Sequence, residues 1–277
     1  METHFNFQGC TAIITGASSG LGAEFARQLA PRVSGLVLAA RSEQTLHTLA
    51  DELRQAHRDL SILVCPCDLA TDEGRAALWE KVDDLGNKPR LLINNAGLGD
   101  YGLFTQAAES RVRQQIDLNI TALTVLSHAF VERITPTAEN PAAILNVSSL
   151  ASTVPVPELA VYAATKAYVS SLTEGLAIEL AHKHIIVLAV CPGPTPTNFG
   201  KNARRETDAD IDRSGQDLLK IPPSRVVATA LHALETGKTL VFPGFLVSLA
   251  AWLFRILPRP VLRFFMRQRY RRSQSEK

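Results

Sequence analysis

The chain has 277 residues, of which 46% are hydrophobic and 20% charged, a balance that excludes a disordered or fibrous protein and suits one large domain. The formal net charge of +2 gives no reason to expect nucleic-acid binding. The cysteines and histidines lack the spacing of metal ligands, so we expect no metal and reduced thiols. The short polar start has no signal-peptide pattern, which predicts a cytoplasmic protein.

Apolar runs rich in β-forming residues alternate along the chain with longer stretches of helical periodicity. The predicted strands are Thr11–Thr15, Leu36–Ala40, Ser61–Cys65, Leu91–Ile93, Ala143–Val147, Ile185–Val190 and Thr239–Phe242. The predicted helices are Gly22–Ala30, Glu43–His57, Asp72–Leu85, Ser110–Arg133, Leu159–His182 and Pro223–Leu234. Almost wholly apolar strands are typical of parallel strands covered on both faces. We therefore predict an α/β fold, a Rossmann-type doubly wound parallel sheet in a single three-layer αβα domain.

A glycine-rich turn joins the first predicted strand to the first helix. Thr15 is followed by Gly16, Gly20 and Gly22 in the pattern T-G-x-x-x-G-x-G. Glycines allow a tight turn and the close approach of a pyrophosphate, while a helix N-terminus offers free N–H groups and the positive end of its dipole. In the first βα unit, such a turn predicts a dinucleotide site.

The order of the motifs resembles that of the short-chain dehydrogenases/reductases. Besides the glycine turn, the resemblance rests on Asn94–Gly97, Asn119, Ser149, Tyr162–Lys166 and Pro192–Thr197. It implies a nicotinamide cofactor, a small-molecule carbonyl or alcohol substrate, and a homodimer or homotetramer paired through the helices Ser110–Arg133 and Leu159–His182.

The resemblance also implies a set of cofactor contacts distributed along the chain. These are Gly16, Ser18, Ser19, Gly20, Leu21, Gly22, Arg41, Ser42, Asp68, Leu69, Asn95, Ala96, Gly97, Tyr162, Lys166, Pro192, Gly193, Thr195 and Thr197. Asp68 has a competing interpretation as an acid at a helix N-terminus. Asn95 is expected to serve partly in holding the central strands together.

The end of the second strand predicts a preference for NADP(H) over NAD(H). A dinucleotide fold usually places an acidic residue there to bind the ribose 2′-hydroxyl, but this chain has Ala40 followed by Arg41. A guanidinium binds a 2′-phosphate through a planar, charge-assisted fork, and Ser18 and Ser42 would add hydroxyl donors. The alternative is a solvated arginine at a strand end.

Tyr162 and Lys166 are the predicted centre of catalysis. Four residues apart on a helix, they share one face, and a nearby ammonium is expected to lower the tyrosine pKa from its usual ~10. The resemblance assigns proton transfer to Tyr162, ribose binding to Lys166, and the substrate oxygen to Ser149, with Ser148 as the neighbouring alternative. Asn119 would help to hold a water near the lysine, or would only satisfy backbone groups.

These residues predict an oxidoreductase that interconverts an alcohol and a ketone or aldehyde, with Tyr162 as acid and base. The competing function is a catalytically idle Rossmann-fold protein that binds cofactor or is recruited to a membrane for regulation. We assign residues 1–243 to the catalytic domain. Within it, residues 198–222 are expected to cover the substrate. Their mixed charges indicate a solvated loop rather than a pocket specific for charge; the charged residues are Lys201, Arg204, Arg205, Asp208, Asp210 and Asp212.

Residues 244–277 form an apolar and basic C-terminal extension. Phe242 to Leu257 is nearly all apolar, and eight basic residues but one acid lie between Arg255 and Lys277. The apolar run is too short for a comfortable membrane span. It fits either a helix lying on a membrane surface or a helix packed on the protein with a solvated basic end. The first interpretation predicts a peripheral membrane contact that delivers apolar or lipid-like substrates.

Overall fold

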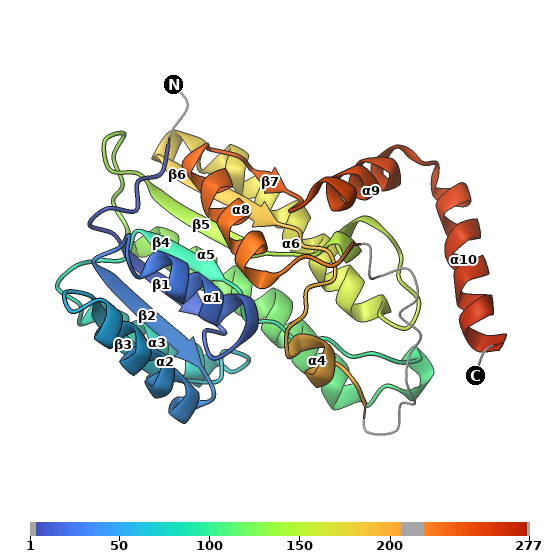
Figure 1. The fold of residues 1–277 in the computed structure, drawn as a ribbon, viewed down its shortest axis with the longest axis horizontal. Helices are drawn as coiled ribbons and strands as arrows, with labels where there is room; N and C mark the ends of the chain where they lie inside the picture. The colour runs from blue at the N-terminus through green and yellow to red at the C-terminus, as the bar shows by residue number, and fades with distance from the viewer. Residues whose placement is uncertain (1–3, 206–218, 276–277) are drawn as a thin grey trace.

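A computed structural model describes residues 4–205 and 219–275 of the chain. Its centre is a seven-stranded sheet in the order β3-β2-β1-β4-β5-β6-β7, in which every neighbouring pair is parallel (Figure 1). The strands are β1 (Thr11–Thr15), β2 (Gly35–Ala40), β3 (Ser61–Pro66), β4 (Leu91–Asn94), β5 (Ala142–Val147), β6 (Ile185–Val190) and β7 (Leu240–Val241). The predicted fold is confirmed.

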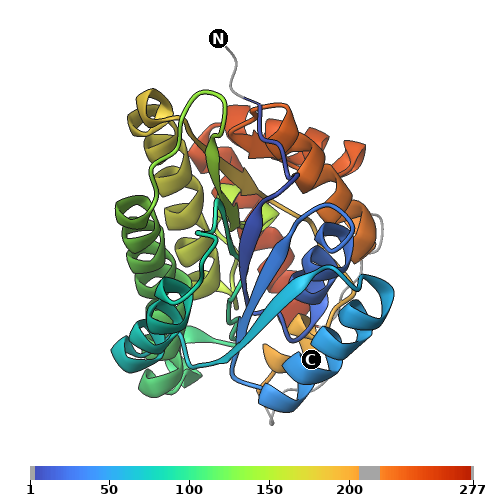
Figure 2. The ribbon, with the colours of Figure 1, turned by 90° about the vertical axis from the view of Figure 1, so that its left-hand side faces the viewer.

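Helices cover both faces of the sheet, which gives three layers (Figure 2). The helices are α1 (Gly20–Leu29), α2 (Glu43–Ala56), α3 (Asp72–Asp83), α4 (Glu109–Ile116), α5 (Leu123–Arg133), α6 (Ala160–Glu179), α7 (Phe199–Asn202), α8 (Pro223–Glu235), α9 (Phe245–Ile256) and α10 (Arg259–Ser275). Successive strand residues face opposite layers, so Ile14 packs with α1, α2 and α8, whereas Ile13 packs with α3, α5 and α6.

The strand order reverses between β1 and β4, which lie side by side although β1 is followed along the chain by β2 and β3. In an open α/β sheet, loops diverge at such a point and leave a crevice beyond the carboxyl ends of the strands. The glycine turn after β1 and the Asn94–Gly97 segment after β4 therefore meet at this crevice.

The predicted helix Ser110–Arg133 differs from the structure. In the structure this segment consists of α4, a π-helical turn η2 (Asp117–Ala122) and α5. A π-turn adds one residue to a helical turn and is frequent at functional sites, but it leaves the hydrophobic periodicity on either side almost unchanged. The pattern in the sequence consequently did not show it, although Asn119 lies in its middle.

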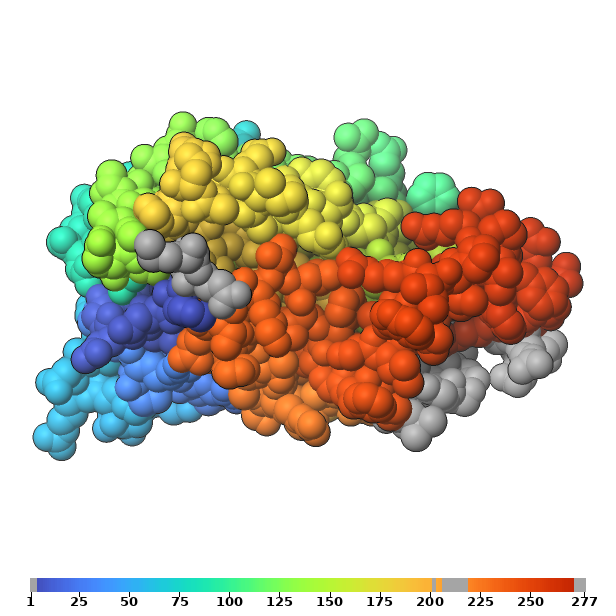
Figure 3. Space-filling view, turned by 90° about the horizontal axis from the view of Figure 1, so that it is seen from above, coloured from blue at the N-terminus to red at the C-terminus, as the bar shows by residue number. Residues whose placement is uncertain are grey.

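The C-terminal extension forms two helices at the end of the molecule where the strands finish (Figure 1), and its residues make up one end of the molecular surface (Figure 3). Val247 and Ala251 of α9 and Leu262 of α10 are buried. Arg255 pairs with Glu174 of α6 at 3.0 Å. One face of α9 is therefore packed on the body, as one of the two interpretations of this segment expected. None of the described helices combines the length and the apolar run needed to cross a bilayer.

Candidate active site

The turn after β1 forms a cradle that side chains would fill. Gly16 has a φ of +65°, and a Cβ atom there would lie 2.9 Å from the Cα of Ala96. A Cβ on Gly22 would collide with the carbonyl oxygen of Gly16. Ser19 stands at the N-cap of α1, yet its hydroxyl makes no capping hydrogen bond. The turn therefore leaves room and donors for an anionic group at the helix N-terminus.

Asn95 joins this turn to the segment after β4. Its side-chain amide donates to the carbonyl oxygens of Thr15 at 2.8 Å and Gly16 at 3.2 Å. The Thr15 hydroxyl in turn accepts from the backbone N–H groups of Asn95 at 2.9 Å and Ala96 at 3.0 Å. Asn95 thus connects the end of β1 to the end of β4, as expected for a residue that serves partly to hold the central strands together.

Arg41 lies at the end of β2 with its side chain exposed. Within residues 4–205 and 219–275 no hydrogen bond or ion pair holds its guanidinium. The residue before it, Ala40, is a buried alanine, so this position carries no acidic side chain. The Ser42 hydroxyl shares a hydrogen bond of 2.7 Å with Thr45.

Asp68 follows β3, and its carboxylate accepts from the backbone N–H of Ala70 at 3.0 Å. The N-cap of α3 is Thr71, whose hydroxyl accepts from Gly74 at 3.1 Å. Asp68 is therefore a turn residue before the helix rather than its cap. Leu69, also expected at the cofactor, is buried.

Two elements, β5 and α6, bring Ser149, Tyr162 and Lys166 together. Ser149 is the second residue after β5, and the other two lie one turn apart on α6. The Lys166 ammonium donates to the carbonyl oxygen of Val147, the last residue of β5, at 2.8 Å. It lies 5.7 Å from the centroid of the Tyr162 ring. The lysine thus ties α6 to the strand end that carries Ser149.

The two candidate serines have different surroundings. Ser148 is buried, donates to the carbonyl oxygen of Lys166 at 2.9 Å and bonds Ser170 at 2.8 Å. Ser149 accepts from the backbone N–H of Ala151 at 3.1 Å and interacts with the Tyr162 hydroxyl. Because Ser148 is committed to packing α6 on β5, the geometry favours Ser149 as the hydroxyl available to a substrate.

Asn119 meets Lys166 at Gly97. A Cβ on Gly97 would lie 3.4 Å from Asn119 Oδ1 and 3.5 Å from Lys166 Nζ. The Asn119 amide exchanges two hydrogen bonds with the backbone of Leu98, at 2.8 and 2.9 Å, and donates to the Thr165 hydroxyl at 3.0 Å. Its side chain therefore holds the loop after β4 against α6, beside the lysine.

Burial governs the two titrating groups. Desolvation raises the pKa of Tyr162 to about 12, although its hydrogen bond with Ser149 opposes the rise. Desolvation lowers the pKa of Lys166 to about 8, with a small opposing contribution from Cys191. The expectation of a lowered tyrosine pKa is wrong here, because the loss of solvent around the phenol raises the pKa. Tyr162 is thus a protonated phenol at neutral pH.

The turn after β6 reaches back over the glycine turn. A Cβ on Gly20 would lie 3.3 Å from the Cβ of Thr197, whose hydroxyl accepts from the backbone N–H of Phe199 at 3.3 Å. The Thr195 hydroxyl donates to the carbonyl oxygen of Gly193 at 3.1 Å. A Cβ on Gly193 would lie 2.8 Å from the side chain of Val247, so α9 covers the outer side of this turn.

The start of the 198–222 segment covers the tyrosine. The ring of Phe199 lies 5.3 Å from that of Tyr162, centroid to centroid. The same ring would touch a Cβ on Gly99 at 2.8 Å, so α7 sits directly on the loop after β4. Residues 206–218, which include Asp208, Asp210 and Asp212, lie outside the described residues.

An ion pair that the sequence did not reveal fixes this cover. Arg205 donates to both carboxylate oxygens of Asp100, at 3.0 and 2.6 Å, and to the carbonyl oxygen of Leu103 at 3.0 Å. The Asp100 side chain is only 4% exposed. The expectation that the charges of this segment are solvated is therefore wrong for Arg205. No local spacing signals a pair whose members are 105 residues apart.

The comparisons agree with this arrangement. A profile of the family described as "short chain dehydrogenase" matches residues 10–208. The chain belongs to this family. Sepiapterin reductase from Rattus norvegicus is 34% identical over 213 residues, which cover 73% of this chain and 80% of the relative.

Solved structures share the fold, and two of the following three contain a nicotinamide cofactor. A short-chain dehydrogenase from Sphingobium yanoikuyae in complex with NADPH has a TM-score of 0.74 and 30% identity, covering 90% of this chain and 97% of that chain. A short-chain dehydrogenase/reductase from Burkholderia phymatum in complex with NAD gives 0.77 and 26%, covering 90% and 94%. A bulky-bulky ketone specific alcohol dehydrogenase from Comamonas testosteroni gives 0.72 and 29%, covering 90% and 95%. The protein is thus an oxidoreductase of the short-chain family with a nicotinamide cofactor.

Proposed function

We propose that this protein is an NADP(H)-dependent oxidoreductase that interconverts an alcohol and a ketone or aldehyde. The observation that carries the proposal is the convergence of Ser149, Tyr162 and Lys166, tied together by the bond from Lys166 to Val147 at 2.8 Å. A protein that only binds a dinucleotide has no need of a buried phenol beside a buried ammonium. Nicotinamide, when bound, supplies or accepts the hydride.

The residues of the chain divide the remaining work. Ser149 donates a hydrogen bond to the substrate oxygen and holds it beside the Tyr162 hydroxyl. Tyr162, a protonated phenol at neutral pH, delivers the proton that converts the carbonyl oxygen into a hydroxyl. Lys166 binds the nicotinamide ribose, and its positive charge favours the phenolate left after transfer. Asn119 acts as a positioning residue, because it fixes the loop beside Lys166.

The cradle at the glycine turn suits the pyrophosphate, because its glycines leave no side chain in the way and Ser19 keeps its hydroxyl unused. We assign the 2′-phosphate to Arg41, which is exposed and follows an alanine rather than an acid. The 2′-phosphate would gain a charge-assisted contact that the 2′-hydroxyl of NAD cannot make. This difference supports the preference for NADP(H).

The exposed side of α6 supports a homo-oligomer. Small or apolar side chains recur there at helical spacing, at Ala164, Ala167, Ser171, Gly175 and Ile178, and each is exposed. A Cβ on Gly175 would have nothing within 4 Å, so the stripe leaves room for a neighbouring helix. Val169 of the same helix faces the other way and is fully buried in the core.

The substrate is proposed to be a bulky, apolar carbonyl compound, since Phe199 covers the tyrosine with a ring and the similar Comamonas enzyme is specific for bulky-bulky ketones. The test is a panel of ketones, aldehydes and alcohols with NADPH and NADH, followed by the absorbance of the reduced nicotinamide. We expect turnover of large apolar ketones with NADPH. Tight cofactor binding without turnover across the panel would refute the proposal and favour an idle cofactor-binding protein.

A further inference from the structure

The helix α9 is apolar on both of its faces, but the body covers only one. Val247 and Ala251, one turn apart, are buried against it, and Phe254 packs on the same core. The opposite face is exposed and consists of Phe245, Leu246, Leu249, Trp252, Leu253 and Ile256. Phe245 is 79% and Trp252 58% exposed. A helix that is apolar all round is ordinarily surrounded by apolar material, so this face lacks a partner within the described residues.

The next helix continues the apolar surface and surrounds it with positive charge. Val261, Phe264 and Phe265 of α10 are exposed. Helical periodicity places Arg267 and Arg271 on one side of this stripe and Arg269 on the other. All three arginines are exposed. Leu262 of the same helix is buried, so α10 is not exposed all round.

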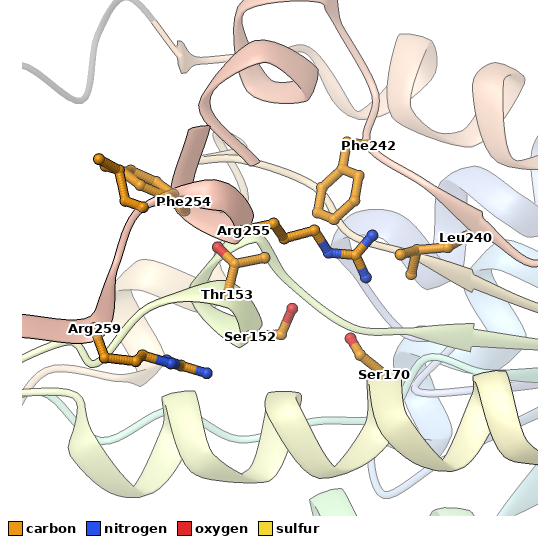
Figure 4. A pocket seen from close by; sticks show the side chains of 9 residues that line it. Ser152, Thr153, Ser170, Leu240, Phe242, Phe254, Arg255 and Arg259 are labelled. Atoms are coloured by element: carbon orange, nitrogen blue, oxygen red, sulfur yellow. The ribbon is translucent and has the colours of Figure 1, made fainter. Parts of the chain in front are cut away.

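Two further arginines of the extension, Arg255 and Arg259, face the body of the protein instead. Figure 4 shows Arg255 and Arg259 directed into a pocket of about 200 Å³ between the extension and the body, beside Ser152, Thr153 and Ser170. Arg255 also pairs with Glu174. The arginines flanking the Phe264–Phe265 stripe are thus a separate group, which is free of this contact.

We propose that the exposed face of α9 and α10 docks on an anionic lipid surface, with the aromatic and aliphatic side chains in the headgroup boundary and the arginines on the lipid phosphates. We call this surface the tail face: Phe245, Leu246, Leu249, Trp252, Leu253, Ile256, Val261, Phe264 and Phe265, with Arg267, Arg269 and Arg271. Apolar side chains interleaved with cations are the pattern of helices that lie in a bilayer interface.

Charge selects lipid over a second copy of the chain. From Gly244 to Arg271 the sequence contains no aspartate or glutamate. A two-fold contact of this face with itself would therefore place arginines against arginines with no acid between them. An anionic membrane supplies both the apolar layer and the negative charge.

The position of the tail face connects it to the substrate. Val247 on the buried side of α9 lies against Gly193, and α9 packs on the turn η3 (Leu150–Thr153), which directly follows Ser149. Figure 1 shows α9 and α10 at the end of the molecule where the strands finish. Docking would hold the entrance for an apolar substrate at the lipid surface. This last step rests on the proposed function, whereas the docking itself does not.

The fluorescence of Trp252 tests the docking directly. The chain has two tryptophans, and the other, Trp79, is buried with its indole nitrogen unpaired, so Trp79→Phe leaves one reporter on the tail face. We expect a blue shift of Trp252 emission and co-sedimentation with vesicles of phosphatidylglycerol and phosphatidylcholine. Molar salt should weaken the binding, because it screens the arginines.

A matched pair of charge variants separates the tail face from the net charge. Arg267→Glu with Arg271→Glu should lower vesicle affinity by more than about tenfold. Arg58→Glu with Lys183→Glu makes the same change in charge at exposed sites just before β3 and β6, at the amino ends of the strands and away from the tail face, and should leave affinity nearly unchanged.

Two results would overturn the proposal. If anionic vesicles cause no shift of Trp252 emission and the protein does not sediment with them, lipid does not cover this face. A shift of Trp252 emission that grows with protein concentration and does not depend on vesicles would identify a second copy of the chain as the partner of the tail face. Both readouts are independent of turnover, so a protein that binds vesicles but reduces no carbonyl would refute the proposed function and leave the docking intact.

Discussion

Replacing Lys166 with methionine should stabilise the folded protein while destroying its activity. The Lys166 side chain lies in the interior, 4% exposed, and burial lowers its pKa from 10.5 to about 8. That fall corresponds to about 3 kcal/mol, the free energy by which the charged form destabilises the fold at neutral pH. Methionine has a similar length and no charge. The variant loses the charge-assisted hydrogen bond from Lys166 to Val147, and this loss offsets about 1.5 kcal/mol of the gain.

The net gain in stability is therefore about 1.5 kcal/mol at pH 7, and it should depend on pH. Because the folded pKa of Lys166 lies below the unfolded one, the folded protein loses this proton first as the pH rises. The unmodified protein therefore recovers stability above about pH 8, and the advantage of the variant should shrink almost to zero near pH 9.5. Tyr162 contributes equally to both proteins over this range and cancels in the difference.

Urea unfolding of the two proteins at pH 7 and pH 9.5, at one protein concentration, measures this difference. Lys183→Met is the matched control, since Lys183 is exposed in the turn before β6, and its effect should stay within about 0.5 kcal/mol at both pH values. A Lys166→Met protein that is less stable than the original at pH 7 would refute the reasoning. It would mean that partners of the ammonium more than compensate for its burial.

Three further outcomes follow from the structure. Ala40→Asp combined with Arg41→Ala should weaken NADPH binding by about tenfold or more and improve NADH binding, as measured by cofactor titration; equal affinities of the unmodified protein for both cofactors would contradict the assignment of Arg41. Gly175→Arg should leave the fold intact and give a monomer by sedimentation, and an unchanged oligomer would exclude the exposed stripe of α6 as the contact between subunits. Asp100→Asn should release Arg205, which we expect to raise KM more than it lowers kcat and to speed proteolysis after α7; unchanged kinetics would show that the cover does not depend on this pair.

The sheet could be predicted from the sequence because its strands are short apolar runs whose pattern depends on burial alone. Ile13 and Ile14 are both fully buried, on opposite faces, and such runs occur in parallel sheets with helices on both sides. The positions of Gly16, Ser149, Tyr162 and Lys166 followed from the order of motifs. The structure adds that β5 and α6 bring the last three together.

The features that escaped prediction depend on contacts between distant segments. The π-turn around Asn119 is accompanied by hydrogen bonds to Leu98 and Thr165, which no periodicity encodes. The bond between Arg205 and Asp100 is equally invisible in local spacing. The direction of the Tyr162 pKa was missed for a related reason, because a spacing reveals the neighbouring charge but not how much solvent the fold removes.

The central claim is that the Tyr162 hydroxyl transfers the proton, and one substitution isolates it. Tyr162→Phe deletes that hydroxyl and keeps the ring that lies against Phe199. Tyr168→Phe is the control, because it removes a second phenol hydroxyl from the same helix, where it bonds Thr124 at 3.0 Å.

The decisive measurement is the rate of NADPH oxidation with an accepted ketone, together with NADPH affinity, for the two variants and the original protein. We predict that Tyr162→Phe lowers turnover by at least about a hundredfold with NADPH affinity nearly unchanged, and that Tyr168→Phe changes neither. Turnover by Tyr162→Phe within a few-fold of the original would contradict the account.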